Sequence, residues 1–201
     1  GYWFVHSKVH VLWAHLRGMN LAERYQPTLE LAQCYSEHAP AMSLIPFYRR
    51  GIAYAQKSLD IRRTFGDLWG QGQSLSYYGV VLYSASQYRA CVEKCREAVR
   101  LLERTGDYWE VHIARYQMAA SLYHLGDHDE AVQQAQRNHA SGLELGDEQA
   151  SGINLDVWVR ATGGAISKEV VHRELDRKRH DAQGTAHVML AEDKRKWRRP
   201  K

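Results

Sequence analysis

Apolar and small residues recur along this chain at the spacing of a helix rather than that of a strand. Residues 88–106 place a narrow stripe on one helix face, at positions i, i+4, i+7, i+8 and i+11: Cys91, Cys95, Ala98, Val99 and Leu102. Residues 67–87 do the same with Leu68, Leu75, Tyr78, Gly79 and Leu82. Neither stretch alternates apolar and polar residues as a half-buried strand does. The pattern predicts two amphipathic helices joined by a short turn.

A second regularity indicates where the helices begin and end. The phrases IRRTFGDLWG (61–70) and LLERTGDYWE (101–110) nearly match, and LELGDEQA (143–150) is a weaker copy of them. Gly can adopt the positive φ that ends a helix, and Asp accepts from the free N–H groups that begin the next one. A fixed period of about 20–50 residues is typical of stacked supersecondary units. The repeated Gly-Asp dipeptide is therefore interpreted as the joint between repeats.

Each unit holds two helix-like segments, so the chain is expected to be an all-α solenoid of stacked antiparallel helix pairs. The expected division is the second helix of a truncated preceding repeat at 1–26, repeats at 27–66, 67–106 and 107–146, a degenerate fourth repeat or cap at 147–180, and a C-terminal helix with a basic tail at 181–201. The first helices of the later units should begin near Asp67, Asp107 and Asp147. In the first unit the expected helices are 28–39 and 47–66, and in the fourth Gly163-Gly164 should end a helix over 147–162.

Paired helices with Gly or Ala midway in the first and small residues early in the second resemble a tetratricopeptide repeat (TPR). The resemblance is carried by Tyr78-Gly79, Leu82, Cys91, Cys95 and Ala98, echoed by Met118-Ala119, Leu122, Ala131 and Ala135. Departures are Leu75 and Arg115 where an early aromatic is usual, and Gly-Asp where a proline is usual. The longer period resembles the variety found in bacterial multidomain signalling regulators, beside an ATPase, kinase, cyclase or DNA-binding domain. The resemblance implies an α-solenoid that acts as a non-catalytic scaffold or regulatory module for protein–protein interaction, although this fold hosts many functions.

The composition of the chain indicates its class of protein and its cellular location. The chain has 201 residues, of which 44% are hydrophobic and 25% charged, as in an ordinary globular protein. No stretch approaches the roughly 18 apolar residues of a membrane span, and the start lacks the core of a signal peptide. Three cysteines without framework spacing indicate reduced thiols, so a cytoplasmic location is expected. The strongly apolar start without Met favours a protein that continues N-terminally.

Two pairs of metal-ligating residue types have simpler explanations. Cys91 and Cys95 could begin a zinc site, but no second pair stands at a companion spacing, and packing on the small-residue stripe explains both. His6 and His10 share a helix face, but no Glu follows His6 as in a zinc-protease helix. The sequence therefore predicts no metal site.

Two polar segments are interpreted in the same way. In HLGDHDEA (124–131) Asp127 and Asp129 are expected to serve as an N-cap and a first-turn acid rather than as part of a proton relay. ATGGAIS (161–167) lacks the spacing of a phosphate-binding loop and is expected to end a helix. The chain is therefore expected to have no enzyme activity and no cofactor.

Positive charge is concentrated at the C-terminal end. The formal net charge is +4, and the residues from Lys168 onward hold eleven Lys and Arg against six Asp and Glu. The tail KRKWRRPK (194–201) adds Trp197, which could stack on a base. A nucleic-acid-binding helical-repeat domain is therefore the alternative function. A solvated linker explains so short a basic run more simply, so nucleic acid is not the preferred partner.

In a solenoid the first helix of each pair lines the concave side. The residues expected to form a partner-binding groove there are Gln73, Ser76, Tyr77, Tyr83, Tyr116, Gln117, Tyr123, His124, Asp156 and Arg160. Tyr83 and Tyr123 stand at equivalent positions, and tyrosine offers a large amphipathic contact area that suits recognition. The competing interpretation is that these rings fill gaps between adjacent first helices. The expected partner is a protein, a peptide or another domain of the same chain, and no membrane; the oligomeric state is not predicted.

Overall fold

Helices account for 83% of residues 8–176, the part of the chain that the computed structural model describes, and no strand occurs in this part. The helices are α2 Lys8–Ala22, α3 Leu29–Leu44, α4 Tyr48–Thr64, α5 Leu68–Ser84, α6 Tyr88–Thr105, α7 Tyr108–Leu125, α8 His128–Leu145, α9 Glu148–Ile153 and α10 Leu155–Ala161. Residues 168–176 are also helical. The prediction of an all-α fold is confirmed. None of the described helices is both long enough and apolar enough to cross a membrane.

Some predictions fall on residues 1–7 and 177–201, outside the described region. They concern His6, the helix expected after residue 181 and the basic tail at 194–201. These remain predictions from the sequence.

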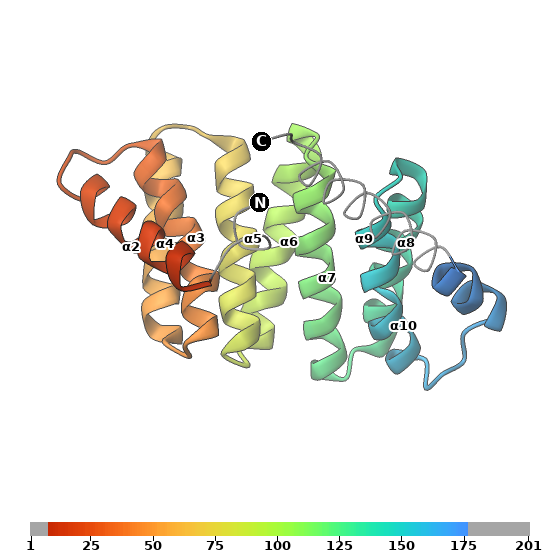
Figure 1. Cartoon of the computed structure of the whole chain (residues 1–201). Helices are drawn as coiled ribbons and strands as arrows, with labels where there is room; N and C mark the ends of the chain where they lie inside the picture. Colours follow the sequence, from red (N-terminus) through yellow and green to blue (C-terminus); the bar gives the residue numbers. More distant parts are fainter. Residues whose placement is uncertain (1–7, 177–201) are drawn as a thin grey trace, which may run out of the picture.

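Consecutive helices pack in neighbouring pairs along the row in Figure 1: α3 with α4, α5 with α6, and α7 with α8. The first helices α3, α5 and α7 also pack against one another in turn, whereas α4, α6 and α8 make little mutual contact. We call the surface made by α3, α5, α7 and α10 the first-helix face.

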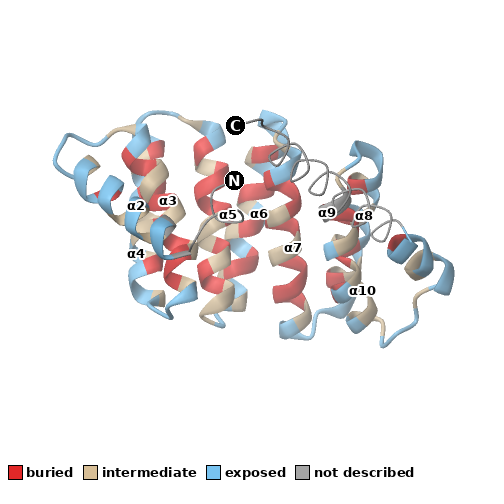
Figure 2. Cartoon of the chain, in the orientation of Figure 1, coloured by how far each residue is buried: buried red, intermediate tan, exposed pale blue. Residues whose placement is uncertain are grey.

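Small residues let the two helices of a pair approach closely. A Cβ atom added to Gly79 of α5 would lie 2.3 Å from Sγ of Cys95 in α6, so only glycine fits at this crossing. Cys91 and Cys95 are fully buried free thiols whose sulfur atoms lie 3.8 Å apart. They belong to a cluster of buried apolar residues to which α4, α5, α6, α7, α8 and α10 contribute. Figure 2 shows the buried segments of these helices in red. The two cysteines thus have the packing role that their spacing predicted.

The Gly-Asp joints have the expected geometry. Gly66, Gly106 and Gly146 adopt positive φ angles of 67°, 77° and 69°. Each following Asp is the N-cap of the next helix, and its Oδ1 atom accepts from the backbone N–H three residues later: Asp67 from Gly70, Asp107 from Glu110 and Asp147 from Ala150. The predicted starts near Asp67, Asp107 and Asp147 are therefore confirmed.

Helix α3 continues beyond the predicted range 28–39. It passes through Pro40 and ends at Leu44. Proline removes one intrahelical hydrogen bond and normally ends or kinks a helix. Here Ala41 and Met42 are 5% and 2% exposed, so burial of the last turn outweighs the unfavourable effect of the proline.

The first helix of the fourth unit is interrupted, which the sequence did not predict. Asn154 lies between α9 and α10, and its side-chain Nδ2 donates to the carbonyl oxygen of Ala150 at 3.0 Å. Such local side-chain bonds to the backbone compete with the regular helical pattern. Gly163 and Gly164 have positive φ angles and end this part of the unit, as predicted.

Candidate functional site

Four of the predicted residues lie on the part of the first-helix face that is farther from the Gly-Asp joints. They are Tyr83 of α5, Tyr116 of α7, and Asp156 and Arg160 of α10. Burial raises the pKa of both tyrosines; the charge of Asp156 raises it further, and that of Arg160 lowers it. Both tyrosines are partly exposed, and Asp156 and Arg160 are exposed. Three successive units therefore contribute polar and aromatic side chains to this part of the first-helix face.

A cluster of rings continues this surface to the turns that follow α5 and α7. The Tyr83 hydroxyl lies 3.3 Å from Nε2 of His124, and the ring of Tyr88 stacks on the His124 ring with centroids 4.6 Å apart. In the next unit Tyr123 stacks on His128 at 5.4 Å. We call Tyr83, Tyr88, Tyr123, His124 and His128 the ring cluster.

The sequence analysis missed Tyr88 and His128, the first residues of α6 and α8. They stand forty residues apart, as do their ring partners Tyr83 and Tyr123. The forty-residue period therefore contained the signal that would have identified them. Searching only the first helices excluded both residues.

The part of the first-helix face next to the Gly-Asp joints, near the N-terminal ends of α5 and α7, is polar and acidic. Gln73 donates from Nε2 to Oε1 of Glu110 at 3.2 Å. Burial raises the pKa of Glu110 to about 7, although hydrogen bonds with Gln73 and Tyr77 oppose this shift. Burial also raises the pKa of Tyr77, and the charges of Glu110, Glu37 and Asp107 raise it further. Tyr77 thus lies among three carboxyl groups.

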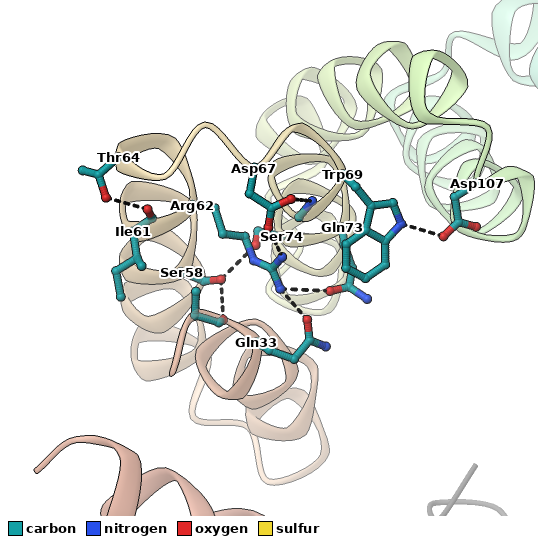
Figure 3. A network of polar contacts seen from close by, with 12 residues as sticks. Gln33, Ser58, Ile61, Arg62, Thr64, Asp67, Trp69, Gln73, Ser74 and Asp107 are labelled. Carbon is teal, nitrogen blue, oxygen red and sulfur yellow. Dashed lines mark hydrogen bonds and ion pairs between the residues drawn. The ribbon is translucent and has the colours of Figure 1, made fainter. Parts of the chain in front are cut away.

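Arg62 links this acidic region to the first joint. Figure 3 shows its guanidinium group between α4 and α5, where Nη1 donates to Oδ2 of Asp67 at 2.8 Å. Nη2 donates to Oε1 of Gln33 and, at 3.3 Å, to Oε1 of Gln73. The side chain is 2% exposed. Sequence analysis assigned no role to this arginine.

Two of the predicted groove residues do not line an open surface. Ser76 is 0% exposed and Gln73 is 6% exposed. Adjacent first helices pack against each other here, so both side chains lie between helices instead of facing solvent. Tyr77, Tyr83, Tyr116, Gln117 and Tyr123 are partly exposed, and His124, Asp156 and Arg160 are exposed. The accessible surface is therefore narrower than predicted.

The segment 124–131 behaves only partly as expected. Asp127 occupies the N-cap position of α8, but its side chain makes no capping hydrogen bond, so the expected capping by this side chain is wrong. Asp129 lies in the first turn of the helix, as expected. Within residues 8–176, no group of three His, Cys, Asp or Glu side chains is placed to hold a metal ion.

No family model matches this chain, and a search of curated proteins finds no match.

Proposed function

We propose that this chain is a non-catalytic interaction module of the TPR type, which binds a peptide or a neighbouring domain on its first-helix face. The observation that carries the proposal is the presence of exposed or partly exposed aromatic and polar side chains on α5, α7 and α10, the first helices of three successive units. Tyr83, Tyr116 and Arg160 come from three successive units, and the positive charge of Arg160 acts on the pKa of both tyrosines. A surface of this kind can follow an extended partner over several residues.

The ring cluster supports recognition better than gap filling. A ring that only filled space between helices would be enclosed, whereas His124 is exposed and Tyr83, Tyr88 and Tyr123 are partly exposed. Rigid amphipathic rings bury a large area on binding at a low cost in side-chain entropy. The polar atoms of the cluster also remain near the surface, where a partner can reach them.

The TPR assignment is supported by the paired helices, their close crossing at Gly79 and the regular period of the joints. A cytoplasmic location and a place within a larger bacterial signalling protein belong to the same proposal. They follow from the resemblance and from the cysteine usage of the sequence.

Selection of random nonapeptides displayed on phage against the full chain tests the proposal. Enriched peptides should bind the wild type and lose about tenfold or more in affinity for a Tyr83→Ala/Tyr116→Ala variant, because two anchoring rings are removed. Tyr108→Ala is the matched control, since Tyr108 is 44% exposed at the start of α7. Circular dichroism should show that all variants retain their helices. Enriched peptides that bind the double variant as tightly as the wild type would contradict the proposal.

The nucleic-acid alternative predicts a different result. A fluorescent oligonucleotide should then bind the chain at about 50 mM salt and dissociate steeply towards about 200 mM, because phosphate contacts release counterions. Tyr83→Ala/Tyr116→Ala should leave that binding unchanged if the basic segment carries it.

A further inference from the structure

Two histidines connect α2 to the helix pair that follows it. Nε2 of His15 in α2 lies 3.1 Å from Nδ1 of His38 in α3, and the two rings stack with centroids 5.3 Å apart. At the other nitrogen of His38, Nε of Arg50 in α4 donates to Nε2 at 2.9 Å. His38 is 0% exposed, and His15 is partly exposed. One buried ring therefore joins three consecutive helices by hydrogen bonds.

Arg50 determines where the protons of both rings lie. An arginine N–H can only donate, so Nε2 of His38 accepts and carries no proton. The proton of His38 is then on Nδ1, which donates to Nε2 of His15. Both rings are neutral in this arrangement. A further proton on either ring would place two N–H groups against each other, so protonation is incompatible with these hydrogen bonds.

The groups around the two rings oppose their protonation. Burial lowers the pKa of His38 to about 4, and the charges of His15 and Arg50 contribute to this shift. Burial also lowers the pKa of His15, which the charge of Glu37 in α3 offsets only in part. Tyr54 of α4 faces His38 edge-on with ring centroids 4.7 Å apart. A histidine whose pKa is lowered by folding contributes stability above its ordinary pKa, and this contribution is lost as pH falls towards the folded value.

The other contacts of α2 are limited. Among the described helices, α2 packs chiefly against α3. The buried apolar residues of this interface are Met19 of α2 with Leu31 and Tyr35 of α3, a far smaller cluster than the one shared by α4 to α8 and α10. The histidine pair is therefore a substantial part of what holds α2 in place.

We propose that the His15–His38 pair is a pH-sensitive switch, in which protonation of the rings releases α2 from α3 and uncovers Leu31 and Tyr35 while α5 to α8 stay folded. Acidification would thus expose an apolar surface of α3 that α2 covers at neutral pH. The switch acts at the α2–α3 contact and does not depend on the binding proposed for α5, α7 and α10.

Hydrogen–deuterium exchange of the full chain, measured by mass spectrometry at about pH 7.5 and about pH 5.5, tests the switch. Dividing each rate by that of the unfolded chain at the same pH removes the intrinsic pH dependence of exchange. Peptides from α2 should lose about tenfold or more in protection at the lower pH, because the released rings bind protons that the docked rings do not. Peptides from α6 and α7 should keep their protection. Unchanged protection of α2 would overturn the proposal.

A neutral substitution separates the histidine pair from other effects of acid. In His15→Gln the amide oxygen can still accept from Nδ1 of His38 but cannot take up a proton in this range, so α2 should stay protected at about pH 5.5. His10→Gln is the matched control, because His10 is exposed on the same helix, and it should behave as the wild type. A loss of protection that persists in His15→Gln would refute the switch.

A second measurement uses the wild-type chain alone and holds even if α2 of His15→Gln does not dock at neutral pH. The ring Cε1–H resonance of His15, followed by NMR, should titrate over the same pH range in which α2 loses protection. Loss of α2 protection without titration of His15 would overturn the proposal.

Discussion

The joints at 66–67 and 106–107 have the same backbone conformation but differ in the side chain that is buried beside the turn. In both, glycine adopts a positive φ, and the N–H of the following Asp donates to the carbonyl oxygen five residues earlier, at 3.1 Å for Asp67 and 3.2 Å for Asp107. The carbonyl at the first joint belongs to Arg62, and the one at the second belongs to Leu102. The same backbone turn thus accommodates a buried cation in one unit and a buried aliphatic side chain in the next.

The side chains that meet at each joint follow from this difference. At the first joint a Cβ atom on Gly70 would lie 1.6 Å from Nη1 of Arg62, so the glycine makes room for the guanidinium group. At the second joint Leu102 packs against Gly72, where an added Cβ atom would lie 2.7 Å from its Cγ. The Gly-Asp dipeptide therefore determines the conformation of the turn. The residue five positions before the Asp determines which side chains pack between neighbouring units.

The second carboxylate oxygen of each capping Asp is also used differently. Oδ2 of Asp67 accepts from Arg62, and Oδ2 of Asp107 accepts from the indole Nε1 of Trp69 at 2.8 Å. At the third joint Oδ2 of Asp147 lies 2.7 Å from Nδ1 of His112. The capping bond is local and repeats, whereas the partner of the second oxygen changes from joint to joint.

The largest expected effect comes from removing the buried cation of the first joint. Arg62→Ala should lower the free energy of unfolding by about 3–5 kcal/mol, because Asp67, Gln33 and Gln73 lose a buried charged partner. Urea denaturation followed by circular dichroism measures this. Arg63→Ala is the control: Arg63 is 47% exposed in a long ion pair with Glu97, so its loss should cost less than about 1 kcal/mol. Equal costs for the two variants would show that the joint does not depend on Arg62.

A second effect concerns pH and the carboxyl group that links the first two joints. The pKa of Glu110 is about 7 in the folded chain against 4.5 in its ordinary environment, so unfolding releases a proton between these values. The contribution of Glu110 to stability therefore falls as pH rises from about 4.5 to 7 and stays constant above that. Relative to the wild type, Glu110→Gln should become more stable over this window, by roughly 3 kcal/mol at the upper end.

The difference between the two unfolding curves isolates Glu110, because other titrating groups affect both chains alike. Urea denaturation at intervals from pH 4.5 to 8 gives that difference. A constant offset between wild type and Glu110→Gln across this range would mean that Glu110 titrates normally and is not confined by Gln73 and Tyr77.

The fold was predictable because its signals are local. The stripe at Cys91 and Cys95, the Gly-Asp dipeptide of each joint and the break at Gly163-Gly164 each act within a few residues of chain. Pro40 and Asn154 show the limit of such reasoning. Burial of Ala41 and Met42 outweighs the local effect of the proline. The sequence pattern predicted one continuous helix around Asn154, but a side-chain hydrogen bond from Asn154 to Ala150 interrupts it.

The candidate site was harder to predict because it joins residues from different units. The sequence predicted Tyr83, Tyr116, Asp156 and Arg160 as binding residues, and the two charged side chains do act on both tyrosines; their role in binding stays a prediction. The burial of Ser76 and Gln73 depends on how closely α3, α5 and α7 pack, which no single unit encodes. Arg62 could have been recognised, since its equivalent forty residues later is the buried Leu102.

A smaller effect tests whether the shared backbone turn needs glycine. Gly106→Val should cost about 1–2 kcal/mol, because a β-branched residue is strained at a φ of 77°. No neighbouring atom lies within 4 Å of an added Cβ, so backbone strain alone produces the loss. Gly106→Asn should cost clearly less, since Asn tolerates this region. Equal melting temperatures of Gly106→Val and the wild type would show that the turn can relax to another conformation.

The smallest effect distinguishes the second joint from the first. Trp69 is 39% exposed, and its indole N–H donates to Oδ2 of Asp107, so Trp69→Phe should remove one charge-assisted hydrogen bond and little buried area. The expected cost is about 0.5–1.5 kcal/mol in urea denaturation, well below that of Arg62→Ala.

Trp109 is the matched control for Trp69, because it stands forty residues later and is 49% exposed. The third joint instead places His112 against Asp147, so Trp109→Phe should change stability by less than Trp69→Phe does. Equal losses from the two substitutions would indicate that each tryptophan stabilises its joint by packing, and that the hydrogen bond to Asp107 contributes nothing measurable.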